Sequence, residues 1–565
     1  MSIARSLMRG SAGNRNDKMM LLLLGELMLV IGLGGPALAL FLSSGTAVHH
    51  PRFHAGGRLL QQSVPKPPRS RVDTAKPGVQ GRVISVSSDK ELQAALDQAS
   101  PGDELALKAG QTFYGNFVLP RKNADRQPEG TWITITSSAG LPASTPAGTR
   151  LTPAAAGALA KLASTNAEPT LRAAPGSGYY RLMGIEVTIA TSVKTNYGLV
   201  RLGEGTEIST DQLPHDIVID RCYIHGLAGS NVRRGIALNC AASAVVDSWI
   251  SDCHEVGADS QAICCWNGPG PFEISNNYLE AAGENVMFGG ADPAIQGLIP
   301  SDIRFIGNYC RKPLEWRAQQ SAARWSVKNL FELKNAERVL VEGNVFDNNW
   351  VDAQTGYAIL FKSVNQDGRA PWSTTRSVTF RRNLVRHTSS GINIEGRDPH
   401  NSSGRTALVL IQNNLFEDLD ANRWGGEGVF IKITDTEDVT VDHNTAFGTG
   451  SIIIAYGEPN ERFVFTQNVV RNNEYGVKGD GTASGTPTLK KFFRGYLVSG
   501  NAILGGNSSP YPPGNCFPPC PVSPGRPSGI KTTVECSGQQ GGMAGCEPDL
   551  MTLADAVSAT GSEAR

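Results

Sequence analysis

From about residue 215 to residue 505 the chain repeats one short pattern of apolar and polar positions. Apolar residues alternate with polar ones, a single polar residue follows, and a second apolar stretch comes next, as in VLVEGNVFDNN (339–349), VTFRRNLVRHT (378–388) and FVFTQNVVRNN (463–473). Alternation with a period of two residues is typical of β-strands. The polar position recurs every 31 residues on average, and eight of its ten occupants are Asn: Cys222, Ser248, Asn277, Asn308, Asn344, Asn383, Asn414, Asn444, Asn468 and Asn501.

A second short apolar strand lies between successive copies of this pattern. A strand with one apolar face and two open edges is not stable alone, so the copies are expected to stack on one another. We therefore predict a coil of ten or more rungs with parallel sheets around one core, wound in the right-handed sense that parallel crossovers favour. The second strands are GIALN (235–239), QAICCW (261–266), NVMFGG (285–290), NLFELK (329–334), YAILFK (357–362), GINIEG (391–396), GVFIKI (428–433) and SIIIAY (451–456).

The recurring Asn has a structural explanation. An Asn side chain carries both donors and an acceptor, so inward-pointing amides on successive rungs bond one another and the turn backbone. We interpret these residues as a scaffold feature and not as a site.

The start of the repeat region, 83–119, adds a helix. Ser88 or Asp89 is the expected cap, and Leu92, Ala95 and Leu96 form an apolar face that would cover the open end of the coil. This helix, together with PGDELAL (101–107) and YGNFVL (114–119), resembles the entry segment of the right-handed parallel β-helix, or pectin-lyase-like, superfamily. The resemblance covers roughly residues 83–505 and implies an all-β fold. Members include polysaccharide lyases, glycoside hydrolases, epimerases, adhesins and many exported bacterial proteins of unassigned activity, so the fold does not select a function.

Composition divides the chain into four parts. In residues 1–42 basic residues precede an apolar run. This pattern indicates either a cleaved signal peptide or an N-terminal membrane anchor. Residues 43–81 are rich in Pro and basic residues and predict a disordered linker. Residues 82–505 form the β-helix, and 506–565 form a Pro/Gly/Cys-rich tail. We therefore expect an exported protein, whether periplasmic, cell-surface or secreted, that contacts membrane only through its N-terminal segment.

Charge and cysteine content narrow the options. Lys and Arg total 52 and Asp and Glu total 52, so the net charge is zero and nucleic acid is not an expected partner. The four tail cysteines allow two disulfides, whereas the six cysteines within the repeats are expected as core residues or as one or two disulfides.

Charged residues on the second strands carry the candidate chemistry. With the aliphatic residues facing inward, Glu332, Lys362, Glu395 and Lys432 face outward, and equivalent residues stack about 4.8 Å apart. Removal of the C5 proton of a uronate needs a base and a group that neutralises the carboxylate. We predict Lys362 or Lys432 as the base, with Glu332 and Glu395 as its partners or as metal ligands. The alternative is a solvated face whose opposite charges pair across rungs.

Long insertions between residues 310 and 430 carry candidate binding residues. Indole rings stack on sugar faces, and guanidinium groups hold acids. Alternatively, the Trp side chains fasten their own loops to the wall of the coil. The predicted substrate-binding residues are Trp316, Trp325, Trp350, Trp372, Trp424, Arg369, Arg397 and Arg423.

Motifs of individual enzyme families are weak. Polygalacturonase carboxylates are missing, since Asn444-Thr445 is followed by Ala446. Asp398-Pro399-His400 resembles part of the Asp-Pro-His-Asp stretch of mannuronan C-5 epimerases, with Asn401 in the last place. We predict binding, with cleavage or epimerisation, of an acidic polysaccharide or cell-surface glycan. The resemblance allows Ca²⁺ as a cofactor but assigns no metal ligands. A non-catalytic adhesive or structural protein is the alternative, so the sequence leaves catalysis open.

Overall fold

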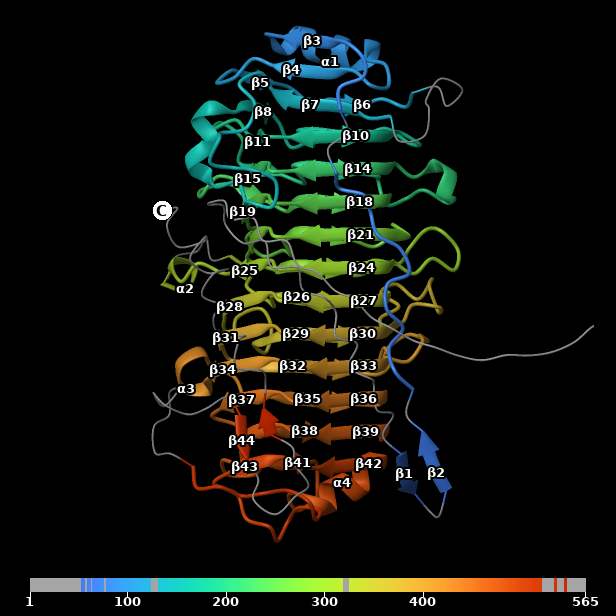
Figure 1. Ribbon diagram of the computed structural model, residues 1–565, viewed down its shortest axis with the longest axis vertical. Helices are drawn as coiled ribbons and strands as arrows, with labels where there is room; N and C mark the ends of the chain where they lie inside the picture. Colours follow the sequence, from blue (N-terminus) through green and yellow to red (C-terminus); the bar gives the residue numbers. More distant parts are fainter. Residues whose placement is uncertain are drawn as a thin grey trace, which may run out of the picture. The chain divides into compact units, whose positions relative to one another are not determined.

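The fold is a right-handed parallel β-helix, as predicted. The structure is a computed structural model that describes residues 52–55, 58–61, 63–75, 78–122, 131–318, 325–520, 533–535 and 543–545. Three long parallel sheets, of 14, 13 and 12 strands, stack rung upon rung along one axis (Figure 1). The predicted signal or anchor segment, residues 1–42, lies outside the described residues. Within the part of the chain that the structure describes, no helix is long and apolar enough to cross a membrane.

The 14-stranded sheet carries the first strand of each repeat. Its strands pair only in parallel with the preceding and following rungs. In order they are β3 (Val83–Val86), β4 (Glu104–Leu107), β7 (Ile133–Ser137), β10 (Gly178–Met183), β14 (His215–Asp220), β18 (Ala241–Val246), β21 (Gly270–Ser275), β24 (Ser301–Ile306), β27 (Ala336–Glu342), β30 (Thr375–Arg381), β33 (Ala407–Gln412), β36 (Glu437–Asp442), β39 (Asn460–Thr466) and β42 (Phe493–Ser499).

The 13-stranded sheet follows the Asn of each rung. Its strands are β5 (Thr112–Tyr114), β8 (Ala160–Ser164), β11 (Ile185–Ile189), β15 (Tyr223–His225), β19 (Trp249–Cys253), β22 (Tyr278–Ala281), β25 (Tyr309–Arg311), β28 (Val345–Asn349), β31 (Leu384–Thr388), β34 (Leu415–Leu419), β37 (Thr445–Gly448), β40 (Val469–Arg471) and β43 (Ala502–Leu504).

The 12-stranded sheet contains the second strands predicted from the sequence. Its strands are β6 (Phe117–Leu119), β9 (Leu171–Ala173), β13 (Val200–Leu202), β17 (Arg234–Leu238), β20 (Gln261–Cys265), β23 (Glu284–Phe288), β26 (Phe331–Leu333), β29 (Tyr357–Lys362), β32 (Ser390–Glu395), β35 (Ile431–Thr434), β38 (Ile453–Ala455) and β41 (Val477–Gly479).

Shorter elements lie at the ends and in the loops. Two-residue β12 (Thr195–Asn196) pairs with β16 (Asn231–Val232), and β44 (Thr533–Glu535) pairs with β45 (Met543–Gly545). The helices and 3₁₀ turns are α1 (Asp89–Gln98), η2 (Pro153–Ala158), η3 (Thr210–Gln212), α2 (Glu315–Ala318), α3 (Ala421–Trp424) and α4 (Thr486–Phe492).

The aligned Asn residues form a continuous ladder inside the β-helix. Asn383 Nδ2 donates to Asn414 Oδ1 at 3.0 Å and to the Val341 carbonyl at 3.1 Å, while its own Oδ1 accepts from Asn344. The same bonds recur on the other Asn rungs, which confirms the structural interpretation. The ladder also extends one step past the prediction, because Asn501 donates to Asn515 Oδ1 at 2.9 Å.

The residue before each ladder position turns the chain. It adopts a left-handed backbone, with φ of 53° at Arg382 and 66° at Gly343. Glycine tolerates this conformation without strain, which explains why several rungs read Gly-Asn. Inside the coil the apolar residues form one core, in which Phe346 stacks on Phe380 with ring centroids 5.8 Å apart.

Helices cover the ends of the coil. Figure 1 shows α1 beside β3 and β4 at the N-terminal end, where Leu92 and Leu96 are buried. Ser88 is the N-cap residue, although its side chain makes no capping hydrogen bond. At the other end α4 buries Leu489 and Phe492 against the last rungs. The expected capping helix is therefore present, and a second one closes the C-terminal end.

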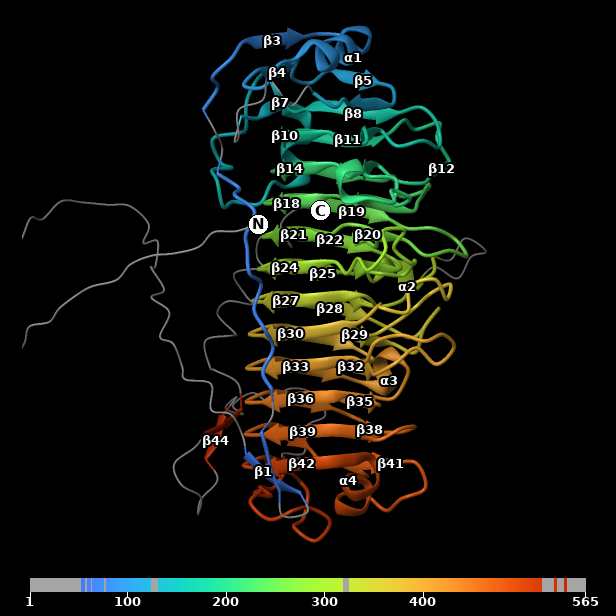
Figure 2. The same cartoon turned by 90° about the vertical axis from the view of Figure 1, so that its right-hand side faces the viewer.

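Residues 63–75, which we call the strap, belong to the segment 43–81 that the sequence predicts as a linker. The strap runs along the 14-stranded sheet across many rungs (Figures 1 and 2). The backbone N–H of Ser63 donates to Asp438, and Arg69 bonds Asp302 through its backbone and its guanidinium. Upstream, β1 (Arg52–Ala55) pairs with β2 (Arg58–Gln61). The strap needs no core of its own, because its basic and backbone groups bind polar groups that the rungs present.

The cysteines within the repeats are core residues. Cys222, Cys240, Cys253, Cys264, Cys265 and Cys310 are buried free thiols. Burial raises the pKa of the Cys222 and Cys240 thiols to about 12, so neither is a ready nucleophile. In the tail, Cys516 is disulfide-bonded.

Candidate functional site

Strand register places the predicted charged residues in two outward columns of the 12-stranded sheet. Lys362 of β29 lies opposite Glu395 of β32, and Asn393 lies opposite Lys432 of β35. Glu332 of β26 lies opposite Leu360, in the same column as Asn393 and Lys432. Outward orientation follows from the alternation of each strand, since the neighbouring residues fill the core.

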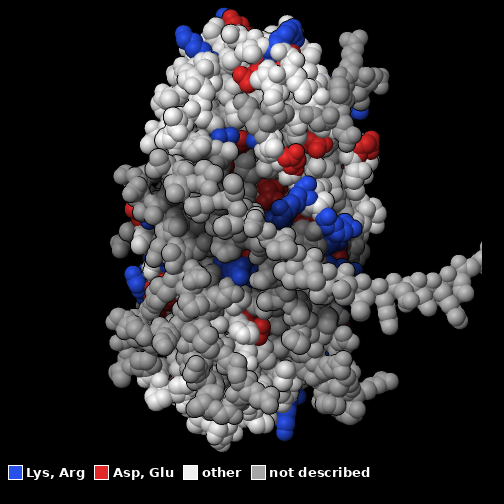
Figure 3. All heavy atoms as spheres, in the orientation of Figure 1, with Lys and Arg blue, Asp and Glu red and all other residues white. Residues whose placement is uncertain are grey.

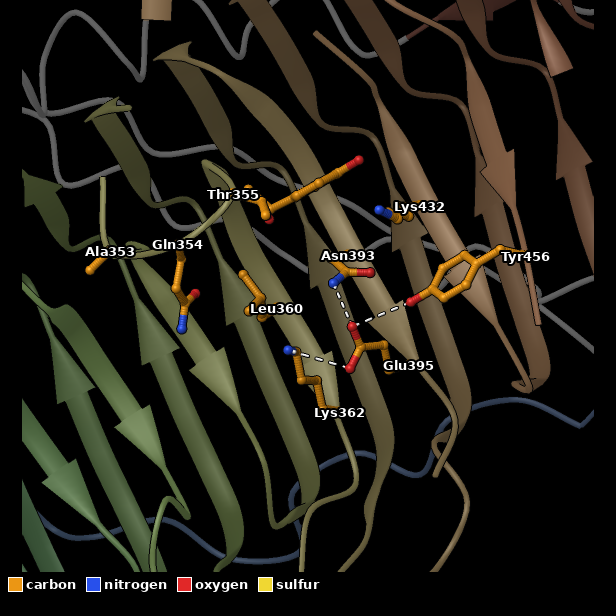
Figure 4. Close-up of a pocket in the computed structure, with 10 residues that line it drawn as sticks. Ala353, Gln354, Thr355, Leu360, Lys362, Asn393, Glu395, Lys432 and Tyr456 are labelled. Carbon is orange, nitrogen blue, oxygen red and sulfur yellow. Dashed lines mark hydrogen bonds and ion pairs between the residues drawn. The ribbon is translucent and has the colours of Figure 1, made fainter. Parts of the chain in front are cut away.

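Glu395 is the hub of the network. Its carboxylate accepts hydrogen bonds from Asn393 Nδ2 at 2.8 Å and from the Tyr456 hydroxyl at 3.3 Å, and it pairs with Lys362 Nζ at 3.4 Å (Figure 4). Three donors thus converge on one carboxylate, one from β32 itself, one from the neighbouring β29 and one from just past β38, two strands away. Burial, followed by the charge of Glu395, raises the pKa of Tyr456, so this phenol keeps its proton well into the alkaline range.

Lys432 lies beside two aromatic rings. Its Nζ is 5.2 Å from the centroid of Tyr456 and 5.9 Å from that of Tyr357, within reach of cation–π attraction. Its acidic partner is Glu427, 3.6 Å away, which also accepts the Tyr357 hydroxyl at 2.7 Å. Burial and the neighbouring Glu427 raise the pKa of Tyr357. Glu427 therefore links the lysine to the phenol from a loop outside the sheet.

These side chains line a pocket of about 440 Å³. The floor is formed by β29, β32 and β35 with Tyr456 just past β38, and the loop 353–355 forms a wall (Figure 4). Lys362, Glu395 and Lys432 all line this pocket. The lining residues are Ala353, Gln354, Thr355, Tyr357, Leu360, Lys362, Asn393, Glu395, Lys432 and Tyr456.

Glu332 is placed differently from the other three predicted catalytic residues. It is 0% exposed and does not line the pocket. Its carboxylate accepts from Asn329 Nδ2 at 3.2 Å and lies 3.6 Å from Lys334 Nζ. Burial and the charge of Glu332 raise the pKa of the neighbouring Glu284. Glu332 cannot contact a substrate in this structure, because the insertions cover it.

The Trp residues of the insertions pack on one another. Trp316, Trp325, Trp350 and Trp424 form one buried cluster and are between 2% and 7% exposed. Rings covered to this degree offer no face to a sugar. Their placement favours the alternative interpretation, in which the indoles fasten the loops to the wall.

The remaining predicted binding residues lie outside the pocket. Trp372 is half-buried and donates to the Leu298 carbonyl at 3.0 Å. Three arginines, Arg369, Arg397 and Arg423, are at least half exposed and pair with Asp367, Asp435 and Asp418 respectively. Arg423 also lies over the ring of Trp424, 4.7 Å from its centroid. No residue of this set lines the pocket, so their role in binding stays a prediction.

The Asp-Pro-His stretch forms an ordinary turn. Asp398 Oδ1 accepts from the backbone N–H of His400 at 2.8 Å, and Oδ2 accepts from that of Asn365 at 2.9 Å. Both carboxylate oxygens are thus used to shape the loop. This geometry gives no support to an epimerase-type site at that position.

Among the described residues, no group of three or more His, Cys, Asp or Glu side chains is arranged to hold a metal ion. Glu395 is committed to three donors, and Glu332 has an ammonium group next to it. A hard cation prefers several free oxygen ligands, so this donor set does not fit Ca²⁺.

Several pocket residues were not singled out from the sequence. Tyr357 begins the strand YAILFK in phase with the core residues Ile359 and Phe361, so the alternation predicts that it faces inward. Gln354 comes from an insertion, where spacing carries no signal. The same holds for Glu427, which is not part of the lining but bonds Tyr357 and Lys432. The useful clue was the length of the insertions, which marks the rungs around the pocket.

Comparisons with known proteins yield only structural likenesses. No protein-family model matches the sequence, and no curated protein does. Among solved structures, the PL6 family alginate lyase AlyGC is 13% identical with a TM-score of 0.45; the match covers 77% of this chain and 53% of the lyase, so the chain spans about half the length of that protein. A GH87 α-1,3-glucanase from Streptomyces thermodiastaticus is 14% identical with a TM-score of 0.46, covering 80% and 72%. Pectate lyase Pel9A is 13% identical with a TM-score of 0.31, covering 71% and 78%. We draw no argument about activity from likenesses at this level.

Proposed function

We propose that this protein binds an acidic polysaccharide in the pocket over β29, β32, β35 and β38 and acts on it by β-elimination or C5 epimerisation. The observation that carries the proposal is the convergence of Lys362, Lys432, Glu395 and Tyr456 on one pocket. Two ammonium groups in a partly enclosed space suit a carboxylate-bearing sugar, because their attraction is less screened there than in open water.

The pocket residues divide into roles on physical grounds. Lys362 is held by Glu395, which two further donors fix, so Lys362 suits the role of a constant positive charge against the sugar carboxylate. Lys432 pairs with Glu427, which stands between Gly426 and Gly428 on a loop. Glu427 can therefore move away from its lysine more easily than Glu395 can. Lys432, once deprotonated, is our choice for the base that takes the C5 proton.

Tyr456 completes the reaction as the proton donor. In elimination, the C5–H electron pair becomes the C4=C5 double bond, and the glycosidic oxygen leaves C4 with the proton of the Tyr456 hydroxyl. In epimerisation, the glycosidic bond stays intact, and C5 takes the proton of the Tyr456 hydroxyl on the face opposite to the one that Lys432 deprotonates. Burial and the charge of Glu395 raise the pKa of Tyr456, so the phenol retains a proton that it can donate.

The test is a screen of the exported form against polymannuronate, polyguluronate and polygalacturonate. Absorbance of unsaturated products reports elimination, and loss or exchange of the C5 proton, followed by NMR in D₂O, reports epimerisation. Each assay is run with Ca²⁺ and with a chelator, which also tests the calcium prediction. Silence in every assay, with and without Ca²⁺, would overturn the enzymatic proposal.

A non-catalytic binding protein is the second candidate. The observation that favours it is that each of the three charged pocket residues, Lys362, Glu395 and Lys432, already has an oppositely charged partner. Calorimetric binding of the same polymers without any product would select this candidate.

Export is part of the proposal and rests on residues 1–42. Basic residues before an apolar run favour a signal or anchor. Fractionation of expressing cells and N-terminal sequencing of the mature protein distinguish a cleaved signal from an anchor, and a protein retained in the cytoplasm would contradict both.

A further inference from the structure

Gln354 on the pocket wall is connected to the buried Glu332 through one intermediate amide. Asn329 Nδ2 donates to Glu332 Oε2 at 3.2 Å and to Gln354 Oε1 at 3.1 Å. Glu332 and Asn329 are both 0% exposed, whereas Gln354 lines the pocket. The three side chains, which we call the relay, therefore run from the interior of the insertions to the pocket surface.

Hydrogen-bond chemistry fixes the direction of the relay. An ionised carboxylate only accepts, so the atom of Asn329 that faces Glu332 has to be its NH₂ group. The second proton of that NH₂ group points at Gln354, so the atom of Gln354 that faces Asn329 has to be its oxygen. The NH₂ group of Gln354 is consequently the part that remains for the pocket.

Lys334 gives the relay carboxylate a charged neighbour. Its Nζ lies 3.6 Å from Glu332 Oε1, and its side chain is itself mostly buried. The Lys334 Nζ also lies 3.9 Å from the Met287 sulfur. The buried carboxylate therefore has an oppositely charged partner on one oxygen and the Asn329 NH₂ group on the other.

The other pocket amide is oriented in a comparable way. Asn393 Nδ2 donates to Glu395, and Glu395 also accepts a hydrogen bond from the Tyr456 hydroxyl. The donors that a ligand meets in the pocket therefore include the ammonium groups of Lys362 and Lys432 and the NH₂ group of Gln354. A carboxylate matches this set, because it only accepts hydrogen bonds and carries a negative charge. A neutral sugar has no charge to match the ammonium groups and therefore gains less from them.

We infer that Glu332 and Asn329 are positioning residues that force Gln354 to present its NH₂ group, and that Gln354 thereby selects carboxylate-bearing over neutral sugars. This rests on the proposed function and deepens it by naming a specificity residue. It also gives the buried Glu332 a role that does not require contact with a substrate.

The first arm of the test reads the relay without any ligand. A neutron structure, or an X-ray structure at sub-ångström resolution, distinguishes the nitrogen of Gln354 from its oxygen. We expect the nitrogen on the pocket side in the wild type. Oxygen on the pocket side would overturn the inference whatever the protein binds.

The second arm measures binding by calorimetry. The probes are a tetramer of galacturonate, a tetramer of mannuronate and a neutral glucose tetramer as reference. In Gln354→Glu an acceptor replaces the donor, and a hydrogen bond to a charged group is lost, so uronate affinity should fall about tenfold or more relative to the neutral tetramer. Gln366→Glu makes the same charge change at an exposed position outside the pocket lining and should leave the ratio unchanged.

Asn329→Leu tests positioning, since it removes the intermediate amide and leaves Gln354 in place. We expect a several-fold loss of uronate preference, with a smaller or no change for the neutral tetramer. Gln354→Met, which has neither donor nor acceptor, serves as the comparison if Asn329→Leu fails to fold. Unchanged ratios in both Gln354 variants would overturn the inference while the proposed function stands. A wild type that binds no uronate would overturn both, with the first arm still reporting whether the relay itself exists.

Discussion

The Asn ladder inside the β-helix and the pocket on its outer surface are both columns of polar residues repeated from rung to rung. In the ladder one residue type recurs, so the donor of Asn383 finds the acceptor of Asn414 and the pattern continues. In the pocket the column changes from Leu360 to Asn393 to Lys432, and its groups pair sideways instead. In a uniform column each side chain bonds its neighbour in the next rung, so no hydrogen-bonding group is left over. In a mixed column some donors remain for a ligand.

The surface charges fit the same contrast. On the face drawn in Figure 3, Lys and Arg lie interspersed with Asp and Glu among the described residues. The pocket is distinguished locally, by three charged residues and two phenols that line one hollow beside the loop 353–355.

Breaking the ladder should produce the largest effect on stability. Asn383→Leu removes bonds to Val341 and Asn414 and leaves buried groups of Asn344 without a partner. Each buried polar group left without a hydrogen-bond partner costs about 1–3 kcal/mol, so we expect the unfolding free energy to fall by about 4 kcal/mol. Chemical denaturation measures it, and Asn393→Leu in the pocket is the control, with a loss below about 1.5 kcal/mol. Equal losses would contradict the contrast between the two columns.

Breaking the pocket should affect turnover and not folding. Lys432→Met keeps the length and apolar stem of the side chain but removes the base, so we expect turnover of a uronate polymer to fall about 100-fold or more. The melting temperature should stay within a few degrees. Lys478→Met is the matched control, because Lys478 occupies the same outward column two strands further on and is exposed. An equal effect of both variants would show that general charge, and not the pocket, matters.

A saturated polar cluster on the 13-stranded sheet sharpens the comparison through pH. Burial of Asp347 opposes its ionisation, but the hydrogen bond from His387 and the charge of Arg386 outweigh burial and lower its pKa to about 2. A lowered carboxyl pKa adds stability above the ordinary value, and this stability is lost as pH falls through about 2. We expect Asp347→Asn to cost roughly 2 kcal/mol at pH 7 and much less near pH 2. A cost that does not change with pH would contradict this.

The strap offers the smallest expected effect. Arg69 bonds Asp302 at 3.0 Å, but its side chain is 70% exposed. An exposed ion pair contributes at most about 1 kcal/mol, so Arg69→Ala should lower unfolding free energy by about 0.5–1 kcal/mol at low salt and by less at high salt. Denaturation at two salt concentrations measures it. A loss above 2 kcal/mol would mean that the strap is tied down by this one residue.

The sequence predicted the scaffold well because the scaffold is periodic. Each ladder Asn and each second strand follows from local alternation, and register then places Lys362, Glu395 and Lys432 on one face. The ladder position of Asn515 was not predicted, because no second apolar strand follows it to mark a repeat.

What the sequence did not predict depends on packing between distant segments. The insertions cover Glu332 and enclose Trp350 and Trp424, which alternation within one strand does not register. The contacts of the strap were not predicted for a similar reason, since a polar segment without apolar periodicity does not indicate its partners. These partners are far away in sequence: Asp302 is 233 residues from Arg69, and Arg181 is 106 residues from Ala75.

A β-helix passes load only between adjacent rungs, since each strand pairs with its two neighbours. The strap is an exception, because it connects Asp438 of β36 to Asp302 of β24 and, through the carbonyls of Thr74 and Ala75, to Arg181 of β10. Because the strap connects distant rungs, it opposes the separation of single rungs from either end of the coil. Pulled along its axis, the molecule should therefore release the strap before the rungs separate, giving two force steps where an untied coil would give a gradual run of small ones.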